Sequence, residues 1–337
     1  MKIYYTASSY GSHLRVATSY RELIRSMHPL VEGIDPADVV ILHHEPRDFS
    51  TLYGDYPALA KKYVIAYCVW ESDELPEAYK KSISHVQEIW TCSRYSSQAF
   101  EKFHPNVHYI PHVIERDTRF SRQHLELVAQ LIEYDPECTY FLAVALQANL
   151  RKNVGALVRA FQTVQPQIPK SKLILKTAYI EKQAWTPSPG LISLSDPISG
   201  TRLNALYHLA TAYVSAHHAE GWGLTLSDAM IFGKPVIATG YSGNLEYMNH
   251  GNSLLVDYAE ENIRAEDCSD LFHAGMKWAY PSETDLQSKL LLLHEQRRSD
   301  WLAEKVQNAS REIAKFDRAS VMGLIRRRLD DIAASRL

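Results

Sequence analysis

Short apolar segments rich in β-branched residues alternate with helical patterns, such as residues 16–27 and 154–164, along most of this chain of 337 residues. Alternating strands and helices are typical of parallel sheets that are covered by helices. The apolar segments have no polar face, as expected for strands buried on both sides. The sequence therefore predicts an α/β fold. Its expected strands are residues 1–8, 38–44, 62–70, 88–93, 107–113, 138–146, 172–179, 191–195, 212–216, 235–239 and 252–258.

A charged and mostly helical segment over residues 114–137 contains no predicted strand and separates the strands into two groups. A chain of this length is long for one domain and comfortable for two. We therefore predict an N-terminal domain over residues 1–113 and a C-terminal domain over 138–310, joined by a helical connection over 114–137. Residues 311–337 are expected to form a C-terminal helix that packs back on the protein.

The C-terminal helix has an alternative interpretation. Its apolar residues share one helical face, and they are Val321, Leu324, Ile325, Leu329 and Ile332. The arginines at 326–328 lie among them, so the helix also fits contact with an anionic membrane surface. The apolar stripe is narrow and two aspartates follow the arginines at once, which favours packing on the protein.

Composition excludes several classes of protein. A formal net charge of -3 gives no general attraction to nucleic acid. The four cysteines form no CxxC pair, so neither a zinc site nor a disulfide framework is predicted, and a reducing compartment fits best. The N-terminus lacks the apolar core of a signal peptide, and no apolar segment approaches the roughly 20 residues that span a bilayer. We expect a cytoplasmic protein, with peripheral contact to the inner face of the membrane as the alternative.

The segment from His218 to Met248 carries the strongest functional pattern, with an EGWG turn, a helix, the strand PVIAT and a second turn GYSGN. Ligands of open parallel sheets bind beyond the carboxyl ends of the strands, which is where Glu220 lies. Gly221 and Gly223 let the backbone approach a ligand closely. This region is therefore a candidate binding site.

A phosphate is the ligand group that this turn suits best. The backbone amides of Gly223, Leu224 and Thr225 are expected at a helix N-terminus, where unpaired amides and the helix dipole favour an anion. A sugar nucleotide would also explain the neighbouring acid, because its diphosphate suits the helix end and its hydroxyls suit carboxylates.

The same turn also has a purely structural interpretation. Thr225 is a possible N-cap, with Asp228 three residues later as in a capping box. That interpretation accounts for Thr225 and Asp228, but not for Glu220 before Gly-Trp-Gly. We therefore favour a ligand-binding role for Glu220 and leave both interpretations open for Asp228.

Arg151 and Lys152 follow a predicted strand and open a predicted helix. Cations are unfavourable at a helix N-terminus, so their placement there favours an anionic partner. Together they suit the diphosphate of a leaving group.

These residues resemble the nucleotide-sugar signature of retaining glycosyltransferases with the GT-B fold, the glycogen-synthase-like and mannosyltransferase-like family (family 4, glycosyl transferases group 1). The resemblance implies two Rossmann-like parallel-sheet domains that face each other across a cleft. It also implies that Glu220 contacts the donor sugar and that Asp228, where the family usually has Glu, holds the ribose hydroxyls. Lys152 matches the family's phosphate-binding lysine, whereas Gln147 stands where many members carry an arginine.

In the N-terminal half, YCVWESDELPEAY, EIWTCSRYSSQAF and YIPHV resemble a bacterial branch of this family that acts on polysaccharides and glycolipids. Trp70 and Glu71 end a predicted strand and are candidates for acceptor binding, although a core tryptophan and a surface glutamate are equally compatible. Gly11 lies where the family has a glycine-rich loop near the phosphates or the acceptor. Weaker candidates, because a lone histidine is more often structural, are His43, His44, His112 and His218.

The resemblance implies transfer of a hexose-type sugar from a nucleotide diphosphate sugar, UDP- or GDP-linked, to a hydroxyl of a saccharide or lipid-linked acceptor in polysaccharide or glycoconjugate biosynthesis. It also implies retained anomeric configuration, through an oxocarbenium-like transition state. No DxD-type carboxylate pair suited to Mg²⁺ is evident, so neither a metal nor another cofactor is expected.

Other functions remain open on the same architecture. One alternative is a sugar-nucleotide epimerase, which would need no acceptor, and another is a phosphorylase, which would release a sugar phosphate. A non-catalytic subunit that binds nucleotide sugars or glycans would explain Asp228, Gln147 and the sparse glycines near Gly11.

Overall fold

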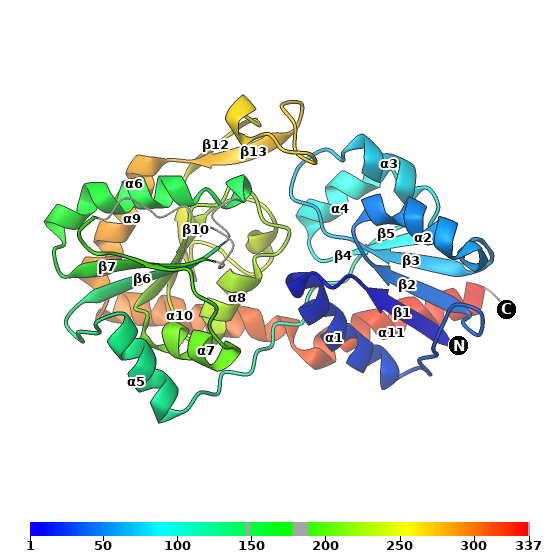
Figure 1. The fold of residues 1–337 in the computed structure, drawn as a ribbon, viewed down its shortest axis with the longest axis horizontal. Helices are drawn as coiled ribbons and strands as arrows, with labels where there is room; N and C mark the ends of the chain where they lie inside the picture. The colour runs from blue at the N-terminus through cyan, green and yellow to red at the C-terminus, as the bar shows by residue number, and fades with distance from the viewer. Residues whose placement is uncertain (146–148, 178–187, 336–337) are drawn as a thin grey trace. The chain divides into compact units, whose positions relative to one another are not determined.

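The computed structural model describes residues 1–145, 149–177 and 188–335 of the chain, which form two compact units (Figure 1). The first unit contains Met1–Ile114, Cys268–Lys277 and Lys315–Leu337, and the second contains Glu115–Asp267 and Trp278–Ala314. Each unit is built on its own parallel sheet, as the alternation of strands and helices in the sequence predicts.

The first unit contains a five-stranded parallel sheet in the order β1-β2-β3-β4-β5. Its strands are β1 (Ile3–Ala7), β2 (Val39–His43), β3 (Tyr63–Tyr67), β4 (Glu88–Thr91) and β5 (Val107–Tyr109). Its helices include α1 (Gly11–Arg25), α2 (Phe49–Asp55), α3 (Glu77–Ile83), α4 (Arg94–Glu101) and α11 (Arg318–Ser335). All five residues of β2 are buried, which is why this strand has no polar face in the sequence.

The second unit contains a six-stranded parallel sheet in the order β11-β10-β9-β6-β7-β8. Its strands are β6 (Thr139–Val144), β7 (Ser171–Lys176), β8 (Leu191–Leu194), β9 (Ala212–Ser215), β10 (Val236–Thr239) and β11 (Leu254–Val256). Its helices include α5 (Arg122–Leu131), α6 (Val154–Val164), α7 (Gly200–Leu209), α8 (Leu224–Ile231), α9 (Glu283–Gln296) and α10 (Asp300–Ile313). The strand order reverses between β6 and β9, as in a Rossmann fold, and ligands of such sheets bind at that reversal.

The predicted strands all appear in the two parallel sheets, so the predicted α/β class is confirmed. Residue 146 of the predicted strand over 138–146 and residues 178 and 179 of the one over 172–179 lie outside the described residues. Two further strands, β12 (Tyr258–Asn262) and β13 (Lys277–Pro281), pair only with each other. The sequence pattern missed β12 because all of its residues are exposed and two of them are glutamates, so it has no apolar periodicity.

The division of the chain differs in detail from the predicted boundaries. Residues 115–137 group with the second unit, where α5 packs on α7, and residues 268–277 group with the first. The phenyl ring of Phe272 stacks on the indole of Trp70 at 4.7 Å between ring centroids, which holds the latter segment on the first unit. This return of the chain to the first unit is not predictable from the sequence, because stacking between distant residues has no local pattern.

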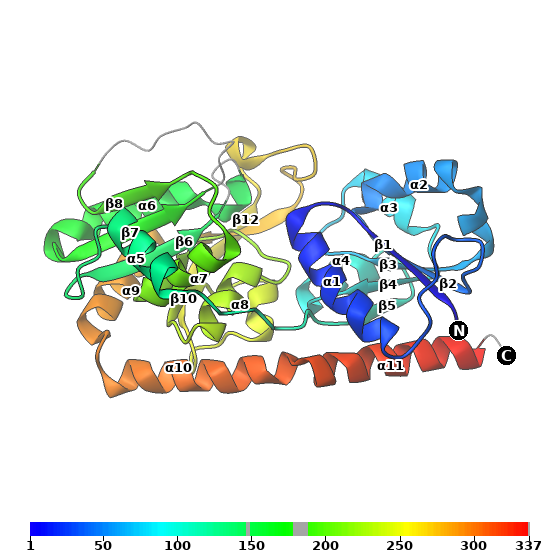
Figure 2. The same cartoon turned by 60° about the horizontal axis from the view of Figure 1, so that its bottom comes forward.

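The C-terminal helix α11 packs on the first unit, where it lies beside α1 (Figure 2). Val321, Ile325, Leu329 and Ile332 are fully buried, which agrees with the favoured interpretation of this helix. The arginines at 326 and 327 are exposed, so membrane contact stays a prediction. Within the described part of the chain, no helix has both the length and the apolar character needed to cross a membrane.

A buried ion pair holds α11 in place. The carboxylate of Glu88, which is fully buried at the start of β4, accepts hydrogen bonds from the Arg328 guanidinium, with 2.9 Å from Nε to Oε2. Its other oxygen accepts one from the Trp90 indole at 2.8 Å. A buried carboxylate needs such partners because removing it from water costs several kcal/mol.

Arg328→Ala is expected to lower the free energy of unfolding by about 3 kcal/mol, because it leaves Glu88 buried without its cation. Urea unfolding followed by circular dichroism measures this change. The matched control is Arg327→Ala, which removes an exposed neighbouring arginine and should change the free energy by less than about 0.5 kcal/mol. Equal losses in the two variants would contradict the role assigned to the Glu88–Arg328 pair.

Candidate active site in the second unit

A recess lies in the second unit where the strand order reverses, at the carboxyl ends of β6 and β9. Lys152, Glu220 and Thr225 line it, together with residues of the two strands. The reversal is where the fold predicts a ligand, and three residues selected from the sequence meet there.

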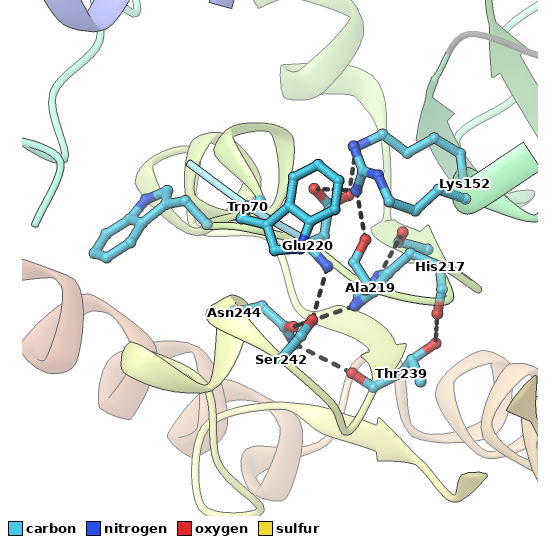
Figure 3. A network of polar contacts seen from close by, with 12 residues as sticks. Trp70, Lys152, His217, Ala219, Glu220, Thr239, Ser242 and Asn244 are labelled. Carbon is cyan, nitrogen blue, oxygen red and sulfur yellow. Dashed lines mark hydrogen bonds and ion pairs between the residues drawn. The ribbon is translucent and has the colours of Figure 1, made fainter. Parts of the chain in front are cut away.

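Glu220 lies in this recess with only 5% of its surface exposed. Its carboxylate forms an ion pair with the Lys152 ammonium through Oε1 and lies 3.2 Å from a terminal nitrogen of the Arg151 guanidinium through Oε2 (Figure 3). Burial by itself would raise the pKa of Glu220, but the Lys152 and Arg151 cations outweigh it and lower the pKa to about 2. Glu220 is therefore an anion at any physiological pH.

Local backbone structure brings the two cations to Glu220. Arg151 and Lys152 lie in a short 3₁₀ turn, Leu150–Lys152, between β6 and α6. The Arg151 carbonyl accepts a hydrogen bond from the His218 amide at 2.8 Å, and its guanidinium donates to the Ala219 carbonyl. The turn is thus tied to the segment that precedes Glu220, which fixes where the cations lie.

The two glycine-rich turns of the sequence pack directly against each other. The Glu220 amide donates to Ser242 Oγ at 2.7 Å, and the Gly243 amide donates to the Glu220 carbonyl at 2.8 Å. A Cβ atom on Gly243 would lie 2.0 Å from the Gly221 carbonyl oxygen, so no larger residue fits at 243. The close contact between the two turns explains why both of them are rich in glycine.

His217 supports the two glycine-rich turns through hydrogen bonds. Its ring nitrogens lie 3.0 Å from Ser215 Oγ and 3.2 Å from Asn244 Oδ1, and its carbonyl accepts a hydrogen bond from Thr239 (Figure 3). Burial lowers the pKa of His217 to about 4, partly offset by the Glu220 carboxylate. His217 is therefore neutral near pH 7 and acts as a support for the turn.

Helix α8 begins at Leu224, with Gly223 as its N-cap in the left-handed conformation at a φ of 86°. Thr225 lies inside the helix, so the capping box considered for Thr225 and Asp228 is wrong. The reason is that Gly223 reaches a φ that a threonine rarely adopts, and the chain enters the helix two residues earlier. The amides of Leu224 and Thr225 therefore lie in the first turn, where helix amides lack intrahelical partners.

Asp228 is 2% exposed and forms an ion pair with Arg116. The distance from the Arg116 guanidinium to Oδ2 is 2.5 Å. Arg116 comes from the segment that opens the second unit and is not among the residues selected from the sequence. Only its charge was visible in the sequence, and its pairing spans 112 residues.

His218, also selected from the sequence, belongs to the second unit but is largely engaged with its core. Its Nδ1 lies 2.7 Å from the Ala279 carbonyl oxygen, and its ring stacks on Trp278 at 5.5 Å with an angle of 4°. Trp278 begins the WAYP segment over residues 278–281. These contacts favour a structural role for His218.

The histidines selected in the first unit meet at the carboxyl ends of its strands. His43 Nδ1 lies 2.8 Å from the Tyr5 hydroxyl, and His112 Nδ1 lies 3.0 Å from the Tyr67 hydroxyl. Burial lowers the pKa of His43 well below its ordinary value and that of His112 to about 3. His44, whose Nε2 lies 3.2 Å from Thr6 Oγ1, is less buried.

The first turn of α1 contains a further candidate, His13, which is not among the residues selected from the sequence. His13 lies in the same turn as Gly11, with its ring 5.3 Å from that of His43 and its Nδ1 3.1 Å from Ser8 Oγ. Its position two residues after Gly11, in the first turn of the helix that follows β1, is the sequence feature that could have identified it.

Trp70 and Glu71 differ in their surroundings. The Trp70 indole is 1% exposed, stacks on Phe272 and donates to the Glu74 carbonyl at 2.6 Å, as expected for the core tryptophan that the sequence allowed. Glu71 is partly exposed beside the turn that contains His13, whose pKa it raises against the larger lowering effect of burial.

Comparison with known proteins finds similarity in the same part of the chain. The model of the family described as glycosyl transferases group 1 matches residues 139–273. Most of the matched residues lie in the second unit. That match covers the β6–β9 reversal, both cations and Glu220.

Similarity to individual proteins extends over more of the chain. The trehalose synthase of Rubrobacter xylanophilus is 20% identical over 263 residues, which are 72% of this chain and 62% of the relative. The chain therefore spans less than two thirds of that curated relative. HepE of Anabaena, solved with UDP and glucose, is 14% identical with a TM-score of 0.68 and covers 98% of this chain and 100% of its own. A glycosyltransferase of Rickettsia africae is 13% identical with a TM-score of 0.68, covering 98% and 96%.

These structures confirm the predicted fold class, two parallel-sheet α/β units of the GT-B type.

Gly243→Ala is expected to disrupt the Glu220 turn, because its Cβ would overlap the Gly221 carbonyl. We expect a loss of at least about 3 kcal/mol of unfolding free energy, in the range of severe overpacking. The control is Gly200→Ala at the start of α7, where a Cβ meets no atom within 4 Å. Thermal melting of both variants checks this prediction. A Gly243→Ala protein that melts at the wild-type temperature would contradict the described packing.

His217 is expected to make stability depend on pH. Its pKa is about 4 in the folded protein and 6.5 ordinarily, so between these values only the unfolded chain binds its proton. The free energy of unfolding should therefore fall as the pH is lowered from 6.5 to 4, by up to about 1.4 kcal/mol per pH unit from this group. Urea unfolding at pH 7 and pH 5 should show a smaller fall for His217→Gln than for wild type. An equal fall in the free energy of unfolding for His217→Gln and wild type would show that His217 does not cause the pH dependence.

Proposed function

We propose that the protein is a retaining glycosyltransferase that moves a hexose-type sugar from a UDP- or GDP-sugar to a hydroxyl of a saccharide or lipid-linked acceptor. The observation that carries this proposal is the buried Glu220 carboxylate, held by two cations beside a helix N-terminus at the strand-order reversal. A permanent anion and two cations in one recess match a donor that contains both hydroxyls and a diphosphate. The family match over residues 139–273 and the UDP and glucose bound to HepE support the same donor class.

The diphosphate would bind Lys152, Arg151 and the amides of Leu224 and Thr225. In the structure described here the two cations face Glu220, and a diphosphate offers them a stronger anionic partner. Glu220 would then accept hydrogen bonds from hydroxyls of the donor sugar, with Gly221 and Gly223 allowing close approach of the backbone.

The reaction breaks the bond between the anomeric carbon and the phosphate oxygen and forms a bond to the acceptor oxygen. Negative charge develops on the leaving diphosphate, where the Lys152 and Arg151 cations and the helix amides stabilise it. The acceptor hydroxyl proton passes to the leaving phosphate oxygen on the same face, so the anomeric configuration is retained. Glu220, as an anion, favours the positive charge that develops on the sugar ring.

We further propose that the reaction proceeds without a metal or another cofactor. The Lys152 and Arg151 cations at Glu220 would supply the positive charge for which a diphosphate otherwise needs Mg²⁺. Unchanged activity in the presence of EDTA is the expected behaviour.

The acceptor is proposed to bind at the carboxyl ends of the first unit's strands. Of the residues selected there, Glu71 and His44 are partly exposed and Gly11 is exposed. The partly exposed His13 joins them. His43 and His112 are more deeply buried and would hold the surrounding groups in place. Trp70, which is part of the core, is not included.

A non-catalytic subunit that binds nucleotide sugars is the second candidate. It is favoured by one observation, the pairing of Asp228 with Arg116 in the position where the family usually has a glutamate. Gln147, the other departure from the family pattern, lies outside the described residues. An epimerase on the same fold would act on the donor without any acceptor.

Glu220→Gln is expected to keep the fold and reduce sugar transfer by about a hundredfold or more, because an amide cannot stabilise a positively charged ring. Transfer from UDP- and GDP-hexoses to a saccharide panel is followed by mass spectrometry, and the anomeric configuration of the product by NMR. Full activity of a folded Glu220→Gln protein would favour the binding subunit, and an inverted product would overturn the proposed stereochemistry.

Lys152→Ala is expected to weaken the stabilisation of the protein by UDP- or GDP-sugars, because it removes one of the two diphosphate-binding cations. Thermal-shift titration with UDP-, GDP-, ADP- and dTDP-sugars measures this. Lys170→Ala, which removes an exposed lysine of the same unit, is the control and should behave as wild type. Equal shifts in wild type and Lys152→Ala would remove Lys152 from the donor site.

A further inference from the structure

Asp228 is held by a residue far away in the sequence. The Arg116 guanidinium donates to Asp228 Oδ2 at 2.5 Å through one terminal nitrogen and to Asn204 Oδ1 at 2.9 Å through Nε. The same guanidinium lies 5.4 Å from the ring centroid of Tyr207 and 5.9 Å from that of Phe232. Two fixed hydrogen bonds and two aromatic neighbours leave this arginine little freedom of orientation.

The segment that carries Arg116 is itself fixed to the second unit. The Asn204 side chain in α7 donates to the carbonyls of Asp117 at 2.6 Å and Arg119 at 3.0 Å. The backbone around Arg116 is therefore tied to the helix that also supplies the acceptor for its Nε. The arrangement connects α7, α8 and the segment that opens the unit into one network.

Asp228 lies on the same face of α8 as the first residue of that helix. Leu224 and Asp228 are four residues apart, and helical side chains point back towards the N-terminus. The Asp228 carboxylate therefore lies over the turn whose amides are proposed to bind the diphosphate. A ribose attached to that diphosphate would lie within reach of it.

Because the Asp228 side chain is shorter than that of glutamate, its carboxylate must be oriented more accurately to reach a ligand. Aspartate has one methylene fewer, so it cannot adjust its reach by an additional rotation about a bond. A carboxylate has about four acceptor positions on its two oxygens, so a guanidinium on one oxygen is compatible with hydroxyl donors on the group. Holding Oδ2 from one side fixes the plane in which the group can accept further hydrogen bonds.

We propose that Arg116 is a positioning residue of the donor site, which orients Asp228 so that its carboxylate accepts hydrogen bonds from the ribose hydroxyls of the nucleotide. This inference rests on the proposed function, because it assumes a nucleotide diphosphate at the N-terminus of α8. It assigns to the Arg116–Asp228 pair the selection of a ribonucleotide over a 2′-deoxyribonucleotide.

The test compares the affinities of UDP and GDP with those of 2′-deoxy-UDP and 2′-deoxy-GDP by isothermal titration calorimetry on the full chain. Wild type is expected to bind the ribonucleotide about tenfold or more tightly than its 2′-deoxy analogue, in keeping with a lost charge-assisted hydrogen bond. In Arg116→Ala the ratio should fall towards one, mainly through weaker binding of the ribonucleotide. In Lys152→Ala both affinities should fall together and the ratio should persist.

Two further variants make the result decisive. Arg119→Ala removes an exposed arginine of the same segment and should keep the wild-type ratio. Arg116→Lys keeps the charge but cannot bond to Asp228 and Asn204 with one rigid group, so its ratio should be intermediate. It also serves as the test if Arg116→Ala does not fold.

A wild-type ratio in folded Arg116→Ala, or in Arg116→Lys should the alanine variant not fold, would overturn the inference and show that Arg116 only stabilises the unit. A wild-type ratio near one would overturn it as well, while leaving the proposed donor site intact. No binding of any of the four nucleotides to wild type would instead overturn the proposed function, and the inference with it.

Discussion

The ion pair of buried Glu220 with Lys152 and Arg151 is the interaction on which the candidate site depends. A carboxylate removed from water costs several kcal/mol unless cations and hydrogen bonds compensate for it. The neighbouring features provide that compensation: the 3₁₀ turn after β6 supplies the cations, and the turn at Gly243 packs on the Glu220 backbone. The result is a fixed negative charge and two positive charges beside a helix N-terminus. Such a set of charges suits a sugar diphosphate better than a neutral ligand.

Among the residues that the structure describes, three buried carboxylates are each paired with an arginine, but their positions separate structural from functional roles. Glu88 lies at the amino end of β4, and its partner Arg328 fixes the terminal helix. Glu220 and Asp228 lie beyond the carboxyl end of β9 and in the helix that follows it. Because ligands of parallel sheets bind at the carboxyl edge, only the latter two are placed for substrate contact.

For several candidate residues, the role depends on tertiary contacts that the sequence pattern does not predict. Trp70 ended a predicted strand, as a ligand contact would, yet Phe272 covers its indole. Thr225 followed a turn, as an N-cap would, yet Gly223 takes that position because of its left-handed backbone. His218 lies beside Glu220 in the sequence, yet its ring stacks on Trp278. In each case the role of the residue is decided by the conformation of a nearby glycine or by an aromatic ring from a distant segment.

The sequence by itself determined the α/β class, the strands of both parallel sheets and the grouping of Glu220, Lys152 and Arg151 as candidates. These properties depend on local periodicity and on the residue types at strand ends, and both can be recognised in short stretches of sequence. Only the tertiary structure decided which charges meet. Lys152 is 68 residues from Glu220, Arg116 is 112 from Asp228, and Arg328 is 240 from Glu88. The pairing of buried charges depends on how strands order themselves in a sheet, and no local pattern encodes that order.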